Sequence, residues 1–212
     1  MEVYDEEQQL EALKRWWRAN GVATLIGVIA GIAVIIGWQL WQNYQQQKIH
    51  AASQGYQQLL DIMAQQDWPN ALTQANQVLE IAQGTPYFAF TQLNKALIEH
   101  QQGHTDAAQA ILKDATAADD QTIAHIARIR QAQLLLNKGD YEAGLALLEG
   151  VNLDQAPGFA GWYQELKGDF YLALQRPGEA RNAYQAAQLA GISSPLLPMK
   201  LADLAVVDTG IE

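Results

Sequence analysis

His100 and His104 have the i, i+4 spacing that lets two imidazoles share a metal ion on a continuous helix. Gly103 stands between them at a predicted turn, and the segment HQQGH holds no acidic residue and no nearby third ligand. His50 and His125 are isolated in the sequence. We therefore interpret all four histidines as surface or packing residues and expect no metal site.

The remaining residue types that support catalysis are equally unpromising. Ser53, Ser193 and Ser194 lie in no Gly-x-Ser-x-Gly elbow, and Ser194 is predicted to cap a helix that starts at Pro195. No glycine-rich loop leads into a Lys-Ser or Lys-Thr pair, as a phosphate-binding loop requires. The chain has no Cys, so thiolate metal sites and Cys nucleophiles are excluded. The residues predict a protein that is not an enzyme and needs no cofactor.

Residues 21–41 read GVATLIGVIAGIAVIIGWQLW, a run without ionisable side chains. As a helix this run is about 30 Å long, the thickness of a bilayer's hydrocarbon core. Trp residues precede and close it, as aromatic belts do at membrane surfaces. We expect an uncleaved transmembrane helix at 21–41 in contact with membrane lipid, after a tail at 1–20.

Basic residues predict the orientation of this helix. Lys14, Arg15 and Arg18 lie just before the apolar run, whereas Lys48 alone follows it within about 15 residues. We expect the tail in the cytoplasm and residues 42–212 across the membrane, a single-pass type II topology. Small residues every four positions, which let a second helix approach closely in lipid, form one stripe on the helix: Ala23, Gly27 and Gly31. The alternative is that Gly and Ala are simply common in membrane helices.

Internal repetition at a constant offset of 36 residues organises the chain after the apolar run. Small residues share one slot at Ala96, Ala132 and Gly168, and a turn falls at Gly103 and Gly139. Each unit is predicted to be a pair of antiparallel helices, with small residues where the helices cross. The sequence thus predicts an all-α fold, a transmembrane helix followed by a helical-repeat solenoid.

The expected repeats cover 85–120, 121–157 and 158–191. A degenerate first pair is expected over 44–83, and a capping helix over about 195–206 is expected to use Leu196, Met199, Leu204 and Val207. The segment 42–50 has no Gly or Pro, so the membrane helix can continue into the first pair.

A repeat array of this kind presents a concave wall built from the first helix of each pair. Residues 42–212 hold 10 basic and 18 acidic side chains, a net charge of −8, so nucleic acid binding is not expected. Apolar side chains with interspersed Gln, Asn and His at the wall suit an extended polypeptide. In the tetratricopeptide pattern, which these repeats resemble, the groove-lining slots correspond to Phe90, Leu93, Leu97, His100, Gln101, Ile126, Ile129, Gln133, Leu136, Asn137, Trp162, Glu165, Asp169 and Leu172. For any one of them, Leu97 and Leu136 especially, ordinary packing between repeats is the alternative.

The repeats resemble the tetratricopeptide pattern, with KGDYEAG at 138–144 as its closest copy. Carboxylate clamps in such domains use clustered Lys and Arg, and the expected wall positions hold neither, which does not favour capture of acidic C-termini. The acidic tail ending in LEALKRWWRANG, the anchor closing with Gly37-Trp38 and the helix containing MKLADL together resemble the YfgM family of ancillary SecYEG translocon subunits.

This resemblance implies an inner-membrane protein of Gram-negative bacteria whose periplasmic domain works beside the SecYEG translocon. It also implies a PpiD-like chaperone as partner and unfolded secreted proteins as clients. Contact of residues 1–19 with a stress-response regulator is a further implied role. The alternative from the residues themselves is a membrane-anchored scaffold for another envelope assembly, which the same anchor and repeats would serve.

Overall fold

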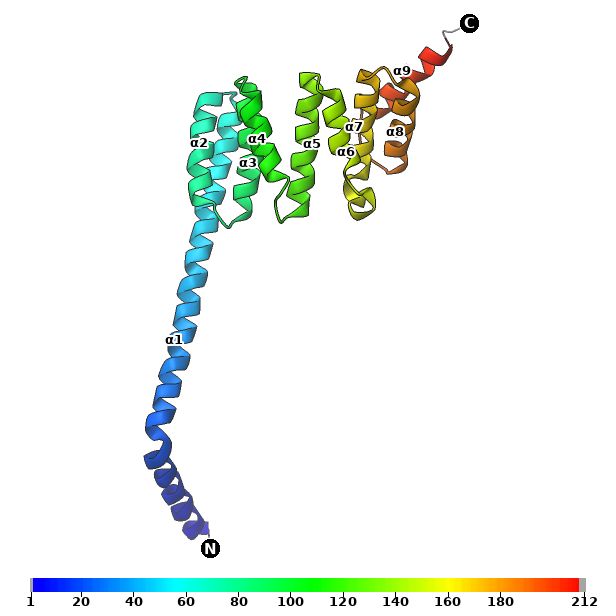
Figure 1. The fold of residues 1–212 in the computed structure, drawn as a ribbon. Coiled ribbons are helices and arrows are strands. Elements are labelled where there is room, and N and C mark those ends of the chain that lie inside the picture. Colours follow the sequence, from blue (N-terminus) through cyan, green and yellow to red (C-terminus); the bar gives the residue numbers. More distant parts are fainter. Residues whose placement is uncertain (1, 210–212) are drawn as a thin grey trace. The chain divides into compact units, whose positions relative to one another are not determined.

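The computed structural model describes the backbone of residues 2–209 and the side chains of residues 10–204. The chain divides into two units, residues 1–51 and 52–212, and its described part contains helices and no strand (Figure 1). The all-α fold class is confirmed. The helices are α1 Glu2–Ala64, α2 Trp68–Ile81, α3 Pro86–Gln101, α4 Thr105–Ala115, α5 Gln121–Lys138, α6 Tyr141–Glu149, α7 Ala160–Ala173, α8 Pro177–Leu189 and α9 Leu197–Thr209, with 3₁₀ turns at Leu153–Gln155 and Pro157–Phe159.

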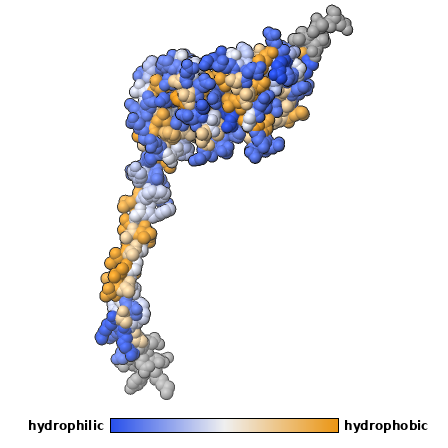
Figure 2. Space-filling model, in the orientation of Figure 1, coloured by the Kyte–Doolittle hydropathy of each residue, from blue (hydrophilic) through white to orange (hydrophobic). Residues whose placement is uncertain are grey.

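The first unit is formed by helix α1 up to Ala51, and the same helix continues without a break to Ala64 in the second unit. By length and composition, one helix of the described chain could cross a membrane, and it covers Leu10–Ala64. Its apolar side chains stay exposed, for example Ile29 and Ile35, and Figure 2 shows them as a continuous apolar stretch. Of the expected cytoplasmic tail, the side chains of residues 1–9 lie outside the described residues.

In the second unit, helices α2 to α8 stand side by side in chain order, each antiparallel to the next (Figure 1). The turns inside the helix pairs share a left-handed residue, with φ of 84° at Gly103, 86° at Gly139 and 59° at Gln175. Each is followed by the N-cap of the pair's second helix, so the turns keep the 36-residue register. Glycine adopts this backbone region without steric cost, whereas Gln175 has a Cβ and adopts it at a steric cost.

The first helix pair departs from this register by one residue. Its left-handed residue is Gln66, with φ of 58°, and its N-cap is Asp67, which accepts a hydrogen bond from the Asn70 amide. Asp67 lies 37 residues before the next N-cap, His104. This shift explains why the first pair matches the repeat pattern poorly. The end of α1 supplies the first helix of this pair, with Leu59 buried beside Ala71 and Ala75.

Small residues lie where helices cross, and large aromatic rings fill the space that they leave. A Cβ on Gly144 of α6 would lie 2.1 Å from the Phe170 ring of α7, and a Cβ on Gly168 would lie 2.3 Å from the Tyr184 ring of α8. Both rings are fully buried. These two contacts join α6 to the next repeat and α7 to its own partner helix, so the repeats stack into one continuous core.

The C-terminal helix differs from the expected one in its start and in its buried face. Helix α9 begins at Leu197, and Leu197, Leu201 and Leu204 pack against α8, spaced one helical turn apart. Leu196 and Met199 are 56% and 63% exposed, so their expected packing was wrong. The Val207 side chain lies outside the described residues. Ser194 does not cap this helix, because its hydroxyl donates to Glu165 Oε1 at 2.9 Å.

Candidate protein-binding groove

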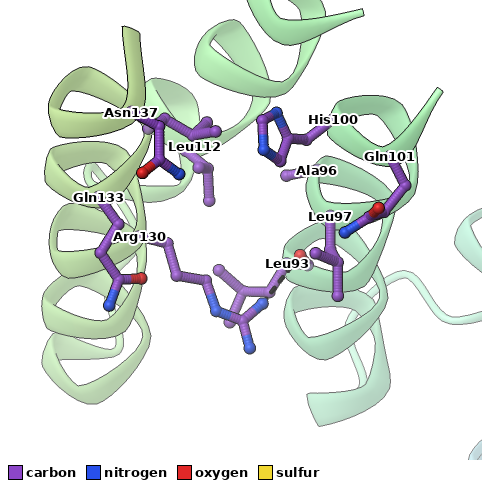
Figure 3. Close-up of a pocket in the computed structure, with 10 residues that line it drawn as sticks. Leu93, Ala96, Leu97, His100, Gln101, Leu112, Arg130, Gln133 and Asn137 are labelled. Atoms are coloured by element: carbon purple, nitrogen blue, oxygen red, sulfur yellow. Dashed lines mark hydrogen bonds between the residues drawn. The ribbon is translucent and has the colours of Figure 1, made fainter. Parts of the chain in front are cut away.

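Helices α3 and α5, the first helices of two successive repeats, face one another across an open cavity of about 360 Å³ (Figure 3). From α3 come Leu93, Leu97, His100 and Gln101, and from α5 come Gln133 and Asn137. All six are residues that the repeat pattern places on the concave wall. Ala96, Leu112, Arg130 and Leu134 complete the lining.

The cavity combines an apolar floor with a polar rim. Leu93, Leu112 and Leu134 are buried, whereas Gln133 and Asn137 are exposed and lie one helical turn apart on α5. Side-chain amides both donate and accept hydrogen bonds, so two at this spacing can pair with the backbone of an extended chain. Figure 3 shows Gln101 and His100 on the opposite side of the opening.

Arg130 is a lining residue that the sequence reasoning missed. Its Nη1 donates to the Leu93 carbonyl oxygen at 2.9 Å, and the side chain reaches from α5 toward α3 (Figure 3). Burial lowers the pKa of the guanidinium from its ordinary value. The expectation of a groove without Lys or Arg was therefore wrong. Arg130 precedes Gln133 by three residues, so the helical period alone puts both on one face.

A second cavity, of about 320 Å³, lies between α5 and α7. It brings together four residues expected on the wall, Ile129, Trp162, Glu165 and Asp169, and shares Gln133 with the first cavity. The segment from Ser194 to Lys200 closes one of its sides. The C-terminal segment is thus part of the wall, which the repeat pattern did not predict.

Lys200 forms ion pairs with both carboxylates of this second cavity. Its Nζ lies 2.9 Å from Glu165 Oε1 and 2.7 Å from Asp169 Oδ1, and the Tyr184 hydroxyl donates to Asp169 at 2.7 Å. Burial alone lowers the pKa of Lys200, but its hydrogen bonds to Asp169 and Glu165 outweigh burial and raise the pKa above its ordinary value. Burial, with the bond to Asp169, also raises the pKa of Tyr184.

Four expected wall residues lie outside both cavities. Phe90 is 41% exposed, with its ring 6.3 Å from that of Tyr56, near the start of α3. Ile126 and Leu136 pack against buried clusters between the helices, and Leu172 is 39% exposed. For Ile126 and Leu136 the structure shows packing between repeats, whereas Leu97 remains open to the first cavity.

The histidine pair does not form a chelating site. Helix α3 ends at Gln101, before His104. His100 Nδ1 lies 3.3 Å from Thr105 Oγ1, and His104 Nδ1 lies 2.9 Å from Glu99 Oε2, so the two rings have different partners. Within residues 10–204, no group of three His, Cys, Asp or Glu side chains converges on a point where a metal ion would sit.

Antiparallel helix pairs stacked around a continuous core, with a groove along their first helices, define a tetratricopeptide-like helical-repeat protein. The model of the tetratricopeptide repeat-like domain family matches residues 14–206. MamA 41-end from Desulfovibrio magneticus RS-1 has a similar fold, with a TM-score of 0.57 at 15% identity over 74% of this chain and 85% of that one.

Two relatives that share most of this chain are both named ancillary SecYEG translocon subunit. The protein from Aggregatibacter actinomycetemcomitans is 30% identical over 203 residues, and that from Haemophilus influenzae is 28% identical over 203 residues. Each alignment covers 94% of this chain and 98% of the relative. The chain belongs to this family of ancillary SecYEG translocon subunits, the YfgM family.

Proposed function

We propose that this protein is a non-enzymatic accessory subunit of the SecYEG translocon in the bacterial inner membrane. The names of its relatives support the association, because those proteins align with the chain over nearly its whole length. The class of fold supports a role in protein-protein interaction, since tetratricopeptide-like arrays act through extended binding surfaces.

Helix α1 anchors the protein in the membrane with its N-terminus in the cytoplasm. Lys14, Arg15 and Arg18 lie on the tail side of the apolar stretch, and basic residues are retained on the cytoplasmic side of such anchors. The repeat domain then works in the periplasm. A tether from the tail to a stress-response regulator would use residues 1–19, and the side chains of 1–9 lie outside the described residues.

The anchor supplies a surface for a membrane-embedded partner. A Cβ placed on Gly27 or Gly31 would meet no atom within 4 Å, so this face is open to another helix. With Ala23 these glycines form a stripe on which a helix of the translocon can pack closely.

The groove receives secreted polypeptides as they emerge, and a PpiD-like chaperone works beside it. The observation that carries this proposal is that two cavities along α3, α5 and α7 share Gln133 and combine apolar with polar lining. The polar side chains are mainly amides in the first cavity and the ion-paired Glu165, Asp169 and Lys200 in the second. A translocating chain is extended and exposes both apolar side chains and unpaired backbone groups, which match these two kinds of lining.

Site-specific photocrosslinking tests the groove. A photoreactive residue at position 133 should crosslink to secreted chains during export and to the chaperone partner. The same residue at Lys113, which is exposed on α4 and lines neither cavity, should not. Equal crosslinking at both positions would contradict a groove function, and crosslinks to cytoplasmic proteins would contradict the orientation. Crosslinks to an unrelated envelope complex would favour the scaffold alternative.

A further inference from the structure

Residues 194–204 contact the third repeat in two different ways. On α8 the contacts are apolar, because Leu197 and Leu204 are buried in a cluster with side chains of that helix. On α7 the contacts are polar, because Lys200 and Ser194 bind the carboxylates of the groove wall. Apolar packing alone is enough to cap the end of a repeat array, so the polar contacts indicate an additional role.

The carboxylates that bind this segment belong to the third repeat in particular. In the 36-residue register, Glu165 corresponds to Ile129, and Asp169 corresponds to Gln133. The first of the three clear repeats has leucine at both positions. Among these three repeats, charged side chains therefore occupy the two wall positions only where residues 194–200 lie beside the wall.

The attachment to α7 depends on side chains. Lys200 and Ser194 bind there within 2.7–2.9 Å of carboxylate oxygens. Within the described chain, the backbone of residues 192–196 forms no hydrogen bond with α5 or α7. Partly buried ion pairs add little net stability, because the loss of hydration offsets most of their attraction, but they fix one geometry. The segment can therefore leave α7 without breaking a backbone hydrogen bond there.

Departure of the segment from α7 would lengthen the groove. Residues 194–200 form one side of the second cavity, whose other lining includes Ile129 and Trp162. Leu196 contributes to this side although it is 56% exposed, so its side chain borders the cavity without being fixed in a core. Without the segment, the wall of α7 would be open to a polypeptide that already occupies the first cavity.

We propose that residues 194–200 form a lid over the α7 part of the groove, held closed by Lys200 and Ser194, and that a bound polypeptide displaces this lid. The apolar contacts of α9 with α8 serve as the hinge. The closed lid lowers the apparent affinity of the groove by the fraction of molecules that are open. This inference rests on the proposed polypeptide-binding function and adds a device that regulates the length of the groove.

The affinity for an extended chain tests the lid. The probe is a fluorescein-labelled peptide of Ala, Gln, Leu and Ser, without charged side chains and long enough to span both cavities. Its binding to the full-length protein in mild detergent is followed by fluorescence anisotropy. We expect K200Q to bind the peptide about tenfold more tightly than the wild-type protein, because the charged hydrogen bonds that hold the lid are lost.

Matched variants separate release of the lid from other effects of the substitution. K200R keeps the cation and should bind the peptide like the wild-type protein. K113Q removes an exposed lysine of α4 that lines neither cavity and should also leave the affinity unchanged. If K200Q only disrupted the fold, the affinity would fall instead of rising. Equal or weaker binding by K200Q would overturn the lid.

A distance measurement follows the displacement itself. The chain has no Cys, so A146C/M199C carries two spin labels at exposed positions that line neither cavity. Double electron–electron resonance should show one distance population in the free protein and a second one when the peptide is bound. Adding K200Q should populate the second distance without peptide. A distribution that saturating peptide leaves unchanged would overturn displacement.

Failure of the lid is distinguishable from failure of the groove. Equal peptide affinities of K200Q and the wild-type protein would overturn the lid and leave polypeptide binding in place. Peptide binding by neither protein, together with crosslinks from position 133 to secreted chains, would likewise overturn the lid alone. Peptide binding by neither protein and no such crosslinks would overturn both.

Discussion

At the scale of single residues, Gln175 holds a left-handed backbone conformation where two other repeats have glycine. This conformation costs an L-residue about 1–2 kcal/mol, so a glycine at position 175 would relieve backbone strain in the folded protein. Glycine also has more conformational freedom in the unfolded chain, which offsets part of this stabilisation. We expect Q175G to raise the free energy of unfolding by up to about 1 kcal/mol. Thermal unfolding followed by circular dichroism measures the effect.

The reciprocal change serves as the control for this turn. Gly139 has φ of 86° at the same place in the preceding repeat, so G139Q should lower the melting temperature. A lower melting temperature for Q175G would mean that the Gln175 side chain stabilises the turn by more than its backbone strain costs.

His125 gives the repeat domain a pH-dependent contribution to stability. Its Nδ1 lies 2.9 Å from the Tyr163 hydroxyl, and its ring lies 4.9 Å from that of Phe159. Burial, with the charge of Arg128, lowers the pKa of His125 below 6.5. The unfolded chain therefore takes up the proton first as pH falls, so this stability is present above about pH 6.5 and is lost below it.

The variant H125Q should accordingly lose less stability than the wild-type protein between pH 7 and pH 5. Melting temperatures of both proteins across this pH range measure the difference in stability. All other titrating groups are the same in the two proteins, so their contributions cancel in this difference. Parallel curves for the two proteins would contradict a lowered pKa at His125.

The groove contains residues that could be predicted from the sequence and residues that could not. Leu93, His100, Gln133 and Trp162 were placed by the groove slots of the tetratricopeptide pattern that the repeats resemble, and each lines a cavity in the structure. Arg130 could have been predicted, since it lies three residues before Gln133 and so on the same face of the helix. It was missed because the repeat pattern does not count its position among the groove-lining ones. Lys200 was out of reach of spacing rules, because only the packing of α9 brings it to α7.

At the scale of elements, the contact between Gly144 and Phe170 controls the stacking of successive repeats. A methyl group at Gly144 meets a fully buried ring at 2.1 Å, so the ring or its helix must shift. We expect G144A to lower the free energy of unfolding by about 1–3 kcal/mol, the usual cost of overpacking. Chemical denaturation provides the measurement.

Gly178 of α8 is the matched control, because a Cβ there meets nothing within 4 Å and its φ is not positive. G178A should be neutral or slightly stabilising, since Ala is the better helix former. Equal effects of the two substitutions would contradict the close approach of α6 and α7.

Lys200 joins the C-terminal helix to the third repeat. The variant K200M leaves Glu165, which is 8% exposed, and Asp169 without their cation. We expect a loss of about 1.5–3 kcal/mol, the scale of hydrogen bonds to charged groups. Hydrogen exchange should show earlier opening of α9, whereas K113M, which changes an exposed lysine of α4, should leave exchange unchanged. Unaltered protection of α9 in K200M would show that Leu197 and Leu204 suffice to hold it.

Element boundaries followed from the sequence wherever the 36-residue register holds, because turn and small-residue slots recur there together. The first pair departs from this register because one additional residue lies between Asp67 and His104, a shift that spacing alone does not reveal. The start of α9 was predicted too early because Pro195 is typical of the first turn of a helix. Its buried face was predicted wrongly at Leu196 and Met199, which are apolar but exposed, whereas Leu197, Leu201 and Leu204 pack against α8.

At the scale of the whole molecule, the chain combines a long apolar helix with a helical-repeat domain. Helix α1 carries an exposed apolar stretch that can cross a membrane, and the repeat domain carries a groove suited to polypeptide. The domain's net charge of −8 disfavours nucleic acid. The sequence alone predicted the apolar helix and the solenoid, because the first is a continuous run without ionisable residues and the second a periodic pattern.

Co-isolation from native membranes in mild detergent tests the central claim most directly. The wild-type protein is compared with the double variant G27L/G31L and with a protein whose residues 21–41 are replaced by a plain Leu/Ala span. We expect SecYEG subunits and a PpiD-like chaperone with the wild-type protein, and loss of SecYEG from both altered proteins while their membrane insertion is unchanged. Absence of SecYEG from the wild-type sample would contradict the account and favour a scaffold for another envelope assembly.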